Sequence, residues 1–149
     1  MSIGQSIAVT PLQLITAFCA IANDGILLRP HIVKSIKNAN GTTYSETHVE
    51  EVRRTIDSAT DKTLVGLLEQ VVAAGGGGKA SVRGYRVAGK TGTAQKVSEY
   101  GLGYDEGKYI ASFCGFAPVE SPQIALLVVI DEPYGSFYGG QIAAPVASR

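Results

Sequence analysis

The stretch VRGYRVAGKTGTAQK, residues 82–96, decides between two folds. Its residues from Gly84 to Thr91 satisfy the pattern Gly-x-x-x-x-Gly-Lys-Ser/Thr of a phosphate-binding loop, which connects a buried strand to a helix. Residues 85–95 also have the β-branched, small and polar composition of a β-strand along the wall of a groove. The sequence on either side of Lys90 distinguishes these two interpretations.

The flanking sequence argues against a phosphate-binding loop. Upstream stands GGGGKASVRG, which contains no apolar run that could form a buried strand. Downstream stands TGTAQKVSEYGLGYDEG, which has no apolar stripe at helical spacing, so no helix would direct its N-terminus at an anion. The apolar segment IALLVVID, ending at Asp131, nevertheless resembles the strand and acid that hold Mg²⁺ in such enzymes. Nucleotide binding therefore stays open as an alternative.

If residues 85–95 form a strand, Lys90 and Gly92 lie on one face, and Thr91 and Thr93 lie on the other. Two hydroxyls can bind a carboxylate, a lysine supplies positive charge, and a glycine allows another backbone to approach closely. These residue types suit the wall of a ligand groove. Taken alone, they equally fit a plain edge strand with a solvated lysine.

Two more strands are expected after this one, over residues 109–117 and 124–131. Short connections that contain glycine or proline favour antiparallel pairing. Because residues 124–131 are apolar on both faces, we expect them to form a central strand covered on both sides. A helix is expected to start at Gln141, since Pro145 is tolerated only in its first turns.

Two helices are expected before the strands. Thr10 can cap a helix over residues 11–23, and Pro11 suits its first turn. A second helix is expected from residue 60 or 61 to residue 73, followed by four glycines. Between them, residues 31–36 predict short strands near an Asn-Gly turn. The order predicts an α+β fold in which three C-terminal strands form an antiparallel sheet flanked by helices.

The composition fits one globular domain or part of one, because 149 residues with 45% hydrophobic residues can bury a core. Thirteen basic residues balance thirteen acidic ones, so charge gives no reason to expect nucleic acid as a partner. Neither a membrane span nor a signal peptide is visible. Cys19 and Cys114 have apolar neighbours, so we expect both to be buried free thiols.

Taken together, these segments resemble the C-terminal part of the transpeptidase domain of class B penicillin-binding proteins. The resemblance rests on SIGQSIAVTPLQLITAFCAIANDGILLRPHIV, GYRVAGKTGTAQK, YIASFCGFAP, IALLVVIDEP and FYGGQIAAPV, in that order. It implies that residues 1–149 form a partial β-lactamase/transpeptidase-like domain. The enzyme it implies lies at the extracytoplasmic face of the bacterial cell membrane. That enzyme cross-links peptidoglycan stem peptides through an acylated serine, without a cofactor or a metal.

The resemblance also implies roles for individual residues. Lys90 would support proton transfer and carboxylate binding, and Thr93 would donate its backbone N–H to the oxyanion. Thr91 and Gly92 would contact the substrate, either the D-Ala-D-Ala stem peptide or a β-lactam that mimics it. The aromatic residues implied to line the pocket are Tyr109, Phe137 and Tyr138, for which ordinary sheet packing is the alternative.

The motifs that supply the nucleophile in this family are missing. The family's serine lies in Ser-x-x-Lys, and a Ser-x-Asn motif adds a hydrogen-bonding pair. No serine of this sequence has lysine at the third or asparagine at the second following position. Both motifs precede SIGQ in the family, so we expect the upstream part of the domain to supply them and this chain to be inactive alone. The remaining strands of the family's sheet are expected there too, which would leave residues 124–131 with an exposed edge that another copy could pair with.

Two alternatives from other functional classes remain open. One is a non-catalytic binding or assembly module that lacks the nucleophile by nature. The other is a nucleotide-binding protein that holds phosphates between Gly84 and Thr91 and Mg²⁺ at Asp131.

Overall fold

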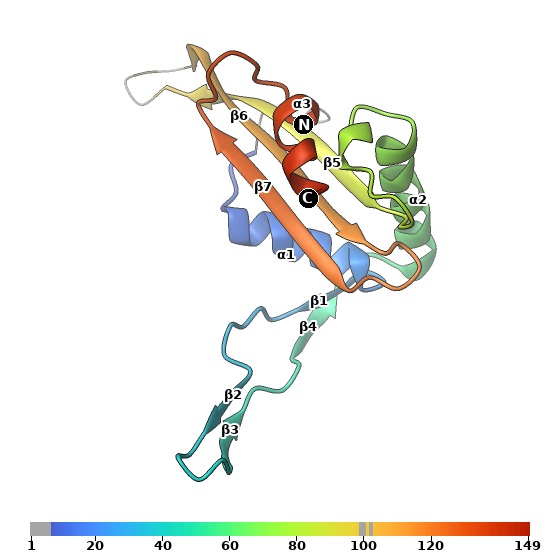
Figure 1. Cartoon of the computed structure of the whole chain (residues 1–149), viewed down its shortest axis with the longest axis vertical. Helices are drawn as coiled ribbons and strands as arrows, with labels where there is room; N and C mark the ends of the chain where they lie inside the picture. The colour runs from blue at the N-terminus through green and yellow to red at the C-terminus, as the bar shows by residue number, and fades with distance from the viewer. Residues whose placement is uncertain (1–6, 99–100, 102) are drawn as a thin grey trace.

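Three long antiparallel strands form the main sheet, with helices on both of its faces (Figure 1). The computed structural model describes residues 7–98, 101 and 103–149. In chain order, the elements are α1 (Pro11–Ala22), β1 (Ile26–Leu28), β2 (Ser35–Lys37), β3 (Thr43–Glu46), β4 (Glu51–Arg54), α2 (Ser58–Ala73), the 3₁₀ helix η1 (Gly78–Ala80), β5 (Ala88–Val97), β6 (Tyr104–Ala117), β7 (Ile124–Asp131), α3 (Gly139–Ile142) and α4 (Ala144–Ala147). The expected α+β fold is confirmed.

The sheet order is β5-β6-β7, with Thr91 opposite Phe113 and Ile110 opposite Asp131. Within the described chain, β6 is therefore the central strand and β7 lies at an edge, so the prediction of a central β7 is wrong for this chain. Its apolar composition has another cause. Helix α1 packs against one face of β7 and α4 against the other, so both faces need apolar side chains.

Strands β5 and β6 differ in extent from the sequence prediction. Residues 85–87 precede β5 because Gly84 turns the chain with a φ of 86°, which favours glycine. Strand β6 begins at Tyr104 rather than Tyr109 and passes through Gly107, whose φ is 74°. Part of the predicted turn region falls on residue 102, which lies outside the described residues.

The start of each of the two main helices is fixed by a capping side chain. At the start of α1, the Gln13 N–H donates to Thr10 Oγ1 at 3.2 Å, and the Thr10 N–H donates to Gln13 Oε1 at 2.9 Å. This reciprocal pair fixes the first turn. Helix α2 starts at Ser58, earlier than expected, because the Asp57 carboxylate accepts the N–H groups of the next turn. It ends at Ala73, just before the glycines, as predicted.

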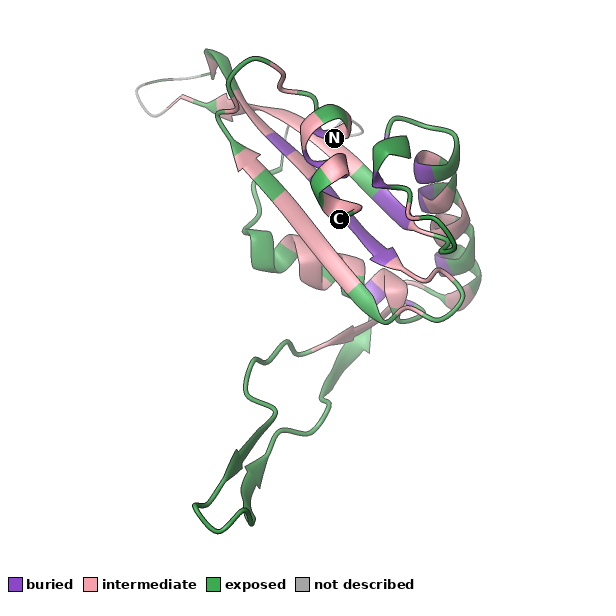
Figure 2. Cartoon of the chain, viewed as in Figure 1, coloured by how far each residue is buried: buried purple, intermediate pink, exposed green. Residues whose placement is uncertain are grey.

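The second half of β6 is buried on both faces, as the purple bands on that strand in Figure 2 show. On one face, Phe113 packs with Val72 of α2 and with residues of η1 and α4. On the other face, Phe116 packs with Leu68 of α2 and with apolar residues of α1. The large rings alternate along β6 and hold helices on both sides of the sheet.

Between α1 and α2 the chain forms two small antiparallel ribbons, β1–β4 and β2–β3, which extend away from the main sheet (Figure 1). Their residues are largely exposed (Figure 2). The sequence predicted strands over residues 31–36 but not β1, β3 or β4. Strands β3 and β4 are exposed throughout, and β1 has only three half-buried residues, so none of them carries an alternating apolar pattern.

The C-terminal segment forms two short helices rather than one helix starting at Gln141. Helix α3 already begins at Gly139, and α4 restarts with Pro145 in its first turn, where proline is tolerated. Of the two free cysteines, Cys114 is buried and burial raises its pKa to about 12, whereas Cys19 is exposed, contrary to the prediction. Within the described residues, no helix has the length and apolar character that a membrane span needs.

Candidate active-site groove

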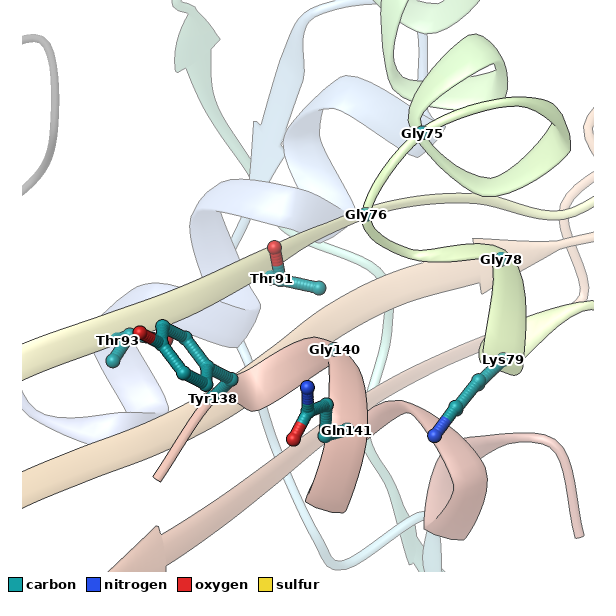
Figure 3. A pocket seen from close by; sticks show the side chains of 9 residues that line it. All are labelled: Gly75, Gly76, Gly78, Lys79, Thr91, Thr93, Tyr138, Gly140 and Gln141. Carbon is teal, nitrogen blue, oxygen red and sulfur yellow. The ribbon is translucent and has the colours of Figure 1, made fainter. Parts of the chain in front are cut away.

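A hollow of about 490 Å³ lies beside β5, between the glycine-rich loop after α2 and the start of α3 (Figure 3). We call it the β5 groove. The residues that line it are Gly75, Gly76, Gly78, Lys79, Thr91, Thr93, Tyr138, Gly140 and Gln141. Three segments that are distant in sequence therefore converge on one cavity.

The alternation along β5 separates the residues predicted from the Lys-Thr-Gly-Thr motif. Thr91 and Thr93 line the β5 groove, as Figure 3 shows. Lys90 is exposed and is not among the lining residues, and its ammonium donates to the backbone oxygen of Thr91 at 2.8 Å. The fold thus brings the two hydroxyls together at the cavity and leaves the lysine beside it. The catalytic role of Lys90 stays a prediction.

Glycines let three backbones meet at this groove. A Cβ on Gly139 would overlap the backbone oxygens of Gly92 and Ser112, so α3 starts directly on the β5–β6 ladder. A Cβ on Gly140 would overlap the backbone oxygen of Gly76 in the loop. At Gly92, a Cβ would meet Ser112 Oγ, a side-chain atom that can rotate away, so this glycine is less constrained. Its expected contact with a substrate stays a prediction.

Two hydrogen bonds fix the residues at the edge of the cavity. The N–H of Gly139 donates to Thr93 Oγ1 at 3.1 Å, which ties α3 to β5. The Ser136 hydroxyl donates to Gln141 Oε1 at 2.7 Å, which restrains the amide that lines the groove. Both bonds lie within normal distances for such groups.

The three predicted aromatic residues form one stack, but only one of them reaches the cavity. The rings of Tyr109 and Phe137 are stacked with centroids 4.1 Å apart, and Phe137 contacts Tyr138 at 4.5 Å. Tyr138 lines the β5 groove and is exposed. Tyr109 and Phe137 are half-buried and do not line the groove, and Phe137 packs against the rings of both Tyr109 and Tyr138.

Sequence reasoning missed Lys79, Gln141 and the lining glycines. Lys79 extends from η1 toward the C-terminal helices in Figure 3, and it is the only charged residue of the lining. The signals were present as the run of four glycines and as the Gly-Gly pair of FYGG. Nothing in the sequence indicated that the run of four glycines and the Gly-Gly pair contact each other. The described residues contain no group of three or more histidine, cysteine or acidic side chains that could hold a metal ion.

The geometry overturns the nucleotide-binding alternative. Thr91 lies inside β5, which continues to Val97, so no helix follows the glycine-lysine pair. Asp131, the magnesium ligand in that alternative, instead forms an ion pair with Lys96, with 3.1 Å between Lys96 Nζ and Asp131 Oδ1.

The comparisons with known proteins agree with the fold. The family model for the penicillin binding protein transpeptidase domain matches residues 1–149. Stage V sporulation protein D of Bacillus subtilis is 41% identical over 148 residues, which are 98% of this chain and 23% of that protein. Peptidoglycan D,D-transpeptidase FtsI of Escherichia coli K12 is 40% identical over 147 residues, 97% of this chain and 23% of that protein.

Among solved structures, the ceftriaxone acyl-enzyme complex of penicillin-binding protein A from Mycobacterium tuberculosis superposes with a TM-score of 0.87 at 29% identity. The match covers 99% of this chain and 33% of that chain. Fold and site thus define one class, the transpeptidase domains. The chain belongs to the penicillin-binding protein transpeptidase domain family. It spans about a quarter of the length of its curated relatives. The comparisons give no support to the non-catalytic module or to the nucleotide-binding protein.

Proposed function

We propose that this chain forms one wall of the acyl-transfer site of a peptidoglycan D,D-transpeptidase. The observation that carries the proposal is the pairing of the Thr91 and Thr93 hydroxyls in one cavity beside an edge strand. Two neighbouring hydroxyls suit a carboxylate, such as the C-terminus of a D-Ala-D-Ala stem peptide or the equivalent group of a β-lactam. The names of the relatives support this assignment.

The edge of β5 offers a second binding element. Among the described strands, β5 pairs only with β6, so backbone groups on its other side are available to an extended ligand. A peptide that adds to a sheet edge gains backbone hydrogen bonds, and neighbouring pockets select its side chains. The backbone N–H of Thr93 would serve as one oxyanion donor, a contribution worth about 3–4 kcal/mol in acyl-transfer enzymes.

In the proposed reaction, a serine hydroxyl attacks the carbonyl between the two D-alanines. The C–N bond breaks, the terminal D-alanine leaves, and an ester forms. The amine of a neighbouring stem peptide then attacks the ester, releasing the serine and forming the cross-link. Lys90 would contribute positive charge and assist proton transfer from its position beside Thr91. No cofactor or metal enters this scheme.

The serine must come from another segment, because no Ser-x-x-Lys occurs in this chain. We therefore assign residues 1–149 to the C-terminal part of the domain, and we assign the nucleophile to a preceding part of a longer parent protein. The length of the relatives supports this division. Because peptidoglycan lies outside the cell membrane, the assembled enzyme would act at the extracytoplasmic face of that membrane.

The proposal is tested by supplying the upstream part of the parent reading frame. We expect no acid-stable adduct of a fluorescent penicillin with this chain alone, and a stoichiometric adduct on the partner's serine when both parts are co-expressed. Lys90→Ala and Thr91→Val should each slow acylation of the pair, because the first removes the positive charge beside the β5 groove and the second removes a hydroxyl that lines it. Lys37→Ala on the exposed strand β2 is the matched control and should not change the rate. Equal acylation of the upstream part without this chain would refute the proposal.

A further inference from the structure

Thr93 connects the two walls of the β5 groove. One wall is β5 itself, and the other is the segment of residues 137–141, which we call the α3 wall. Among the described residues, one side-chain hydrogen bond joins the two walls: the Gly139 N–H donates to Thr93 Oγ1 at 3.1 Å, in a partly buried position. Thr91 lies on the same face of β5, but its hydroxyl has no partner among the described residues.

The position of the α3 wall depends on this close approach. Gly139 is buried, and its Cα lies against the backbone of Gly92 and Ser112, where a Cβ would not fit. Helix α3 has no side-chain cap of its own, and its N-cap residue is Tyr138. The Thr93 hydroxyl is therefore the acceptor that fixes the first N–H of the helix. A displacement of Gly139 would carry with it Tyr138 and Gln141, both of which line the groove.

The same bond determines what the Thr93 hydroxyl can still do. A threonine hydroxyl has one proton to donate and two lone pairs that accept. The Gly139 N–H occupies a lone pair, so the proton cannot point toward Gly139 and is free to be donated to a ligand. An N–H that donates into a hydroxyl also polarises it, which strengthens the bond that the hydroxyl donates. Thr91 lacks this contact, so the two threonines are not equivalent.

We propose that Thr93 is a positioning residue. Its Oγ1 anchors the α3 wall to β5 by accepting the Gly139 N–H. This role does not depend on the proposed function. The experiment below is carried out without ligand, so its failure is distinguishable from a failure of the transpeptidase assignment.

The test is amide hydrogen exchange at Gly139, measured by NMR on the ¹⁵N-labelled full chain. Thr93→Val keeps the shape and β-branching of the side chain but removes the acceptor. We expect exchange at Gly139 to become roughly five- to tenfold faster, the scale of one lost hydrogen bond. Thr93→Ser restores the hydroxyl and should return exchange to the wild-type rate. Thr91→Val is the matched control on the same face and should leave exchange at Gly139 unchanged.

An internal reference separates anchoring from general stability. Ala111 lies opposite Thr93 in the β5–β6 ladder and reports on the sheet itself. Equal acceleration at Ala111 and Gly139 in Thr93→Val would mean that Thr93 supports the whole sheet, and this would overturn the proposal. So would an unchanged Gly139 rate, or a failure of Thr93→Ser to restore it.

A second readout follows the position of the α3 wall directly. The chain contains no tryptophan, so Tyr138→Trp introduces a single fluorophore at the groove. In this background, Thr93→Val should increase quenching of the indole by acrylamide, and Thr93→Ser should not. Identical quenching in all three proteins would show that the α3 wall does not depend on Thr93.

Discussion

The two edges of the main sheet are built for different partners. The β5 edge presents threonines and lies beside glycine-rich segments that leave a cavity open. The β7 edge is apolar along its length, with half-buried side chains and exposed Ile124 and Val129. Both strands pair only with β6 within the described chain. A polar edge next to a cavity suits a small ligand, whereas an apolar edge suits another protein strand.

The largest effect is expected from one added methyl group on the β5 side of the sheet. Gly139→Ala places a Cβ against the backbone oxygens of Gly92 and Ser112, neither of which can move without distorting the ladder. We expect a loss of about 1–3 kcal/mol in the free energy of unfolding, as for other overpacked sites. Urea titration measures it. Gly66→Ala in α2 is the control, because nothing lies within 4 Å of its Cβ position.

Gly66→Ala should stabilise the chain slightly, since alanine is the better helix former. If Gly139→Ala were as stable as Gly66→Ala, the close approach of α3 to the ladder would not constrain this position. The β5 edge would then be an ordinary strand edge, no different in kind from the β7 edge.

The periodic parts of this fold could be predicted from the sequence. The three strands, the cap at Thr10 and the end of α2 before the glycines all followed from local patterns. The resemblance supplied the Lys-Thr-Gly-Thr motif, and alternation along the strand correctly separated Lys90 from Thr91 and Thr93. These features depend on residues close together in sequence.

The contacts that complete the groove could not be predicted in this way. Gly140 meets the backbone of Gly76, and the Gly139 N–H meets the Thr93 side chain, both across long sequence separations. Such contacts leave no periodic signal in a single sequence. For the same reason, Lys79 and Gln141 were not recognised as lining residues. The composition of β7 predicted a central strand, because helices on both faces make an edge strand as apolar as a central one.

A charged side chain on β7 should weaken the pairing of this edge with another strand. Val129→Lys places an ammonium group on a strand that would become central once an upstream strand pairs with it, so pairing would bury the charge. We expect association with the co-expressed upstream part to weaken by roughly tenfold or more, the effect of about 1.4 kcal/mol. Thr91→Val on the β5 edge should leave association unchanged. Binding is measured by titration of the purified parts, and equal effects of the two variants would contradict the division between the edges.

A carboxyl group outside both edge strands offers a test in which the stability of the chain changes and neither edge is altered. Asp61 of α2 is buried, and its Oδ1 has no hydrogen-bond partner. Burial raises its pKa, and the nearby Asp24 carboxylate raises it further. The folded state holds the Asp61 proton more tightly than the unfolded state. The contribution of this group to the free energy of unfolding is therefore fully present below the usual aspartate pKa. This contribution is lost as pH rises through the raised pKa of the folded state.

Asp61→Asn should therefore stabilise the chain at pH 7 by about 1 kcal/mol, the lower end of the cost of an unsatisfied buried group. The gain should shrink as pH falls toward the usual aspartate pKa. Urea titrations across that range measure it, with Asp105→Asn, a carboxyl paired with Lys108, as the contrasting variant. A gain that is independent of pH would show that the charge of Asp61 is not the cause. The variant should change neither penicillin acylation nor association with the upstream part.

The smallest effect is expected where the two edges are joined directly. Lys96 of β5 forms ion pairs across β6 with Asp131 at 3.1 Å and Glu132 at 2.8 Å. The hydrogen bonds to Glu132 and Asp131 and their negative charges raise the Lys96 pKa, but the acidic side chains are exposed and screened by salt. Lys96→Met should therefore change the urea midpoint only slightly at low salt, and not measurably at roughly 1 M salt, where the screening length is about 3 Å. Lys37→Met on β2 controls for the loss of a surface charge. A large loss that persisted in high salt would mean that this ion pair, rather than the hydrogen-bonded β6 ladder, holds the two edges together, and the edges could then no longer be treated as independent.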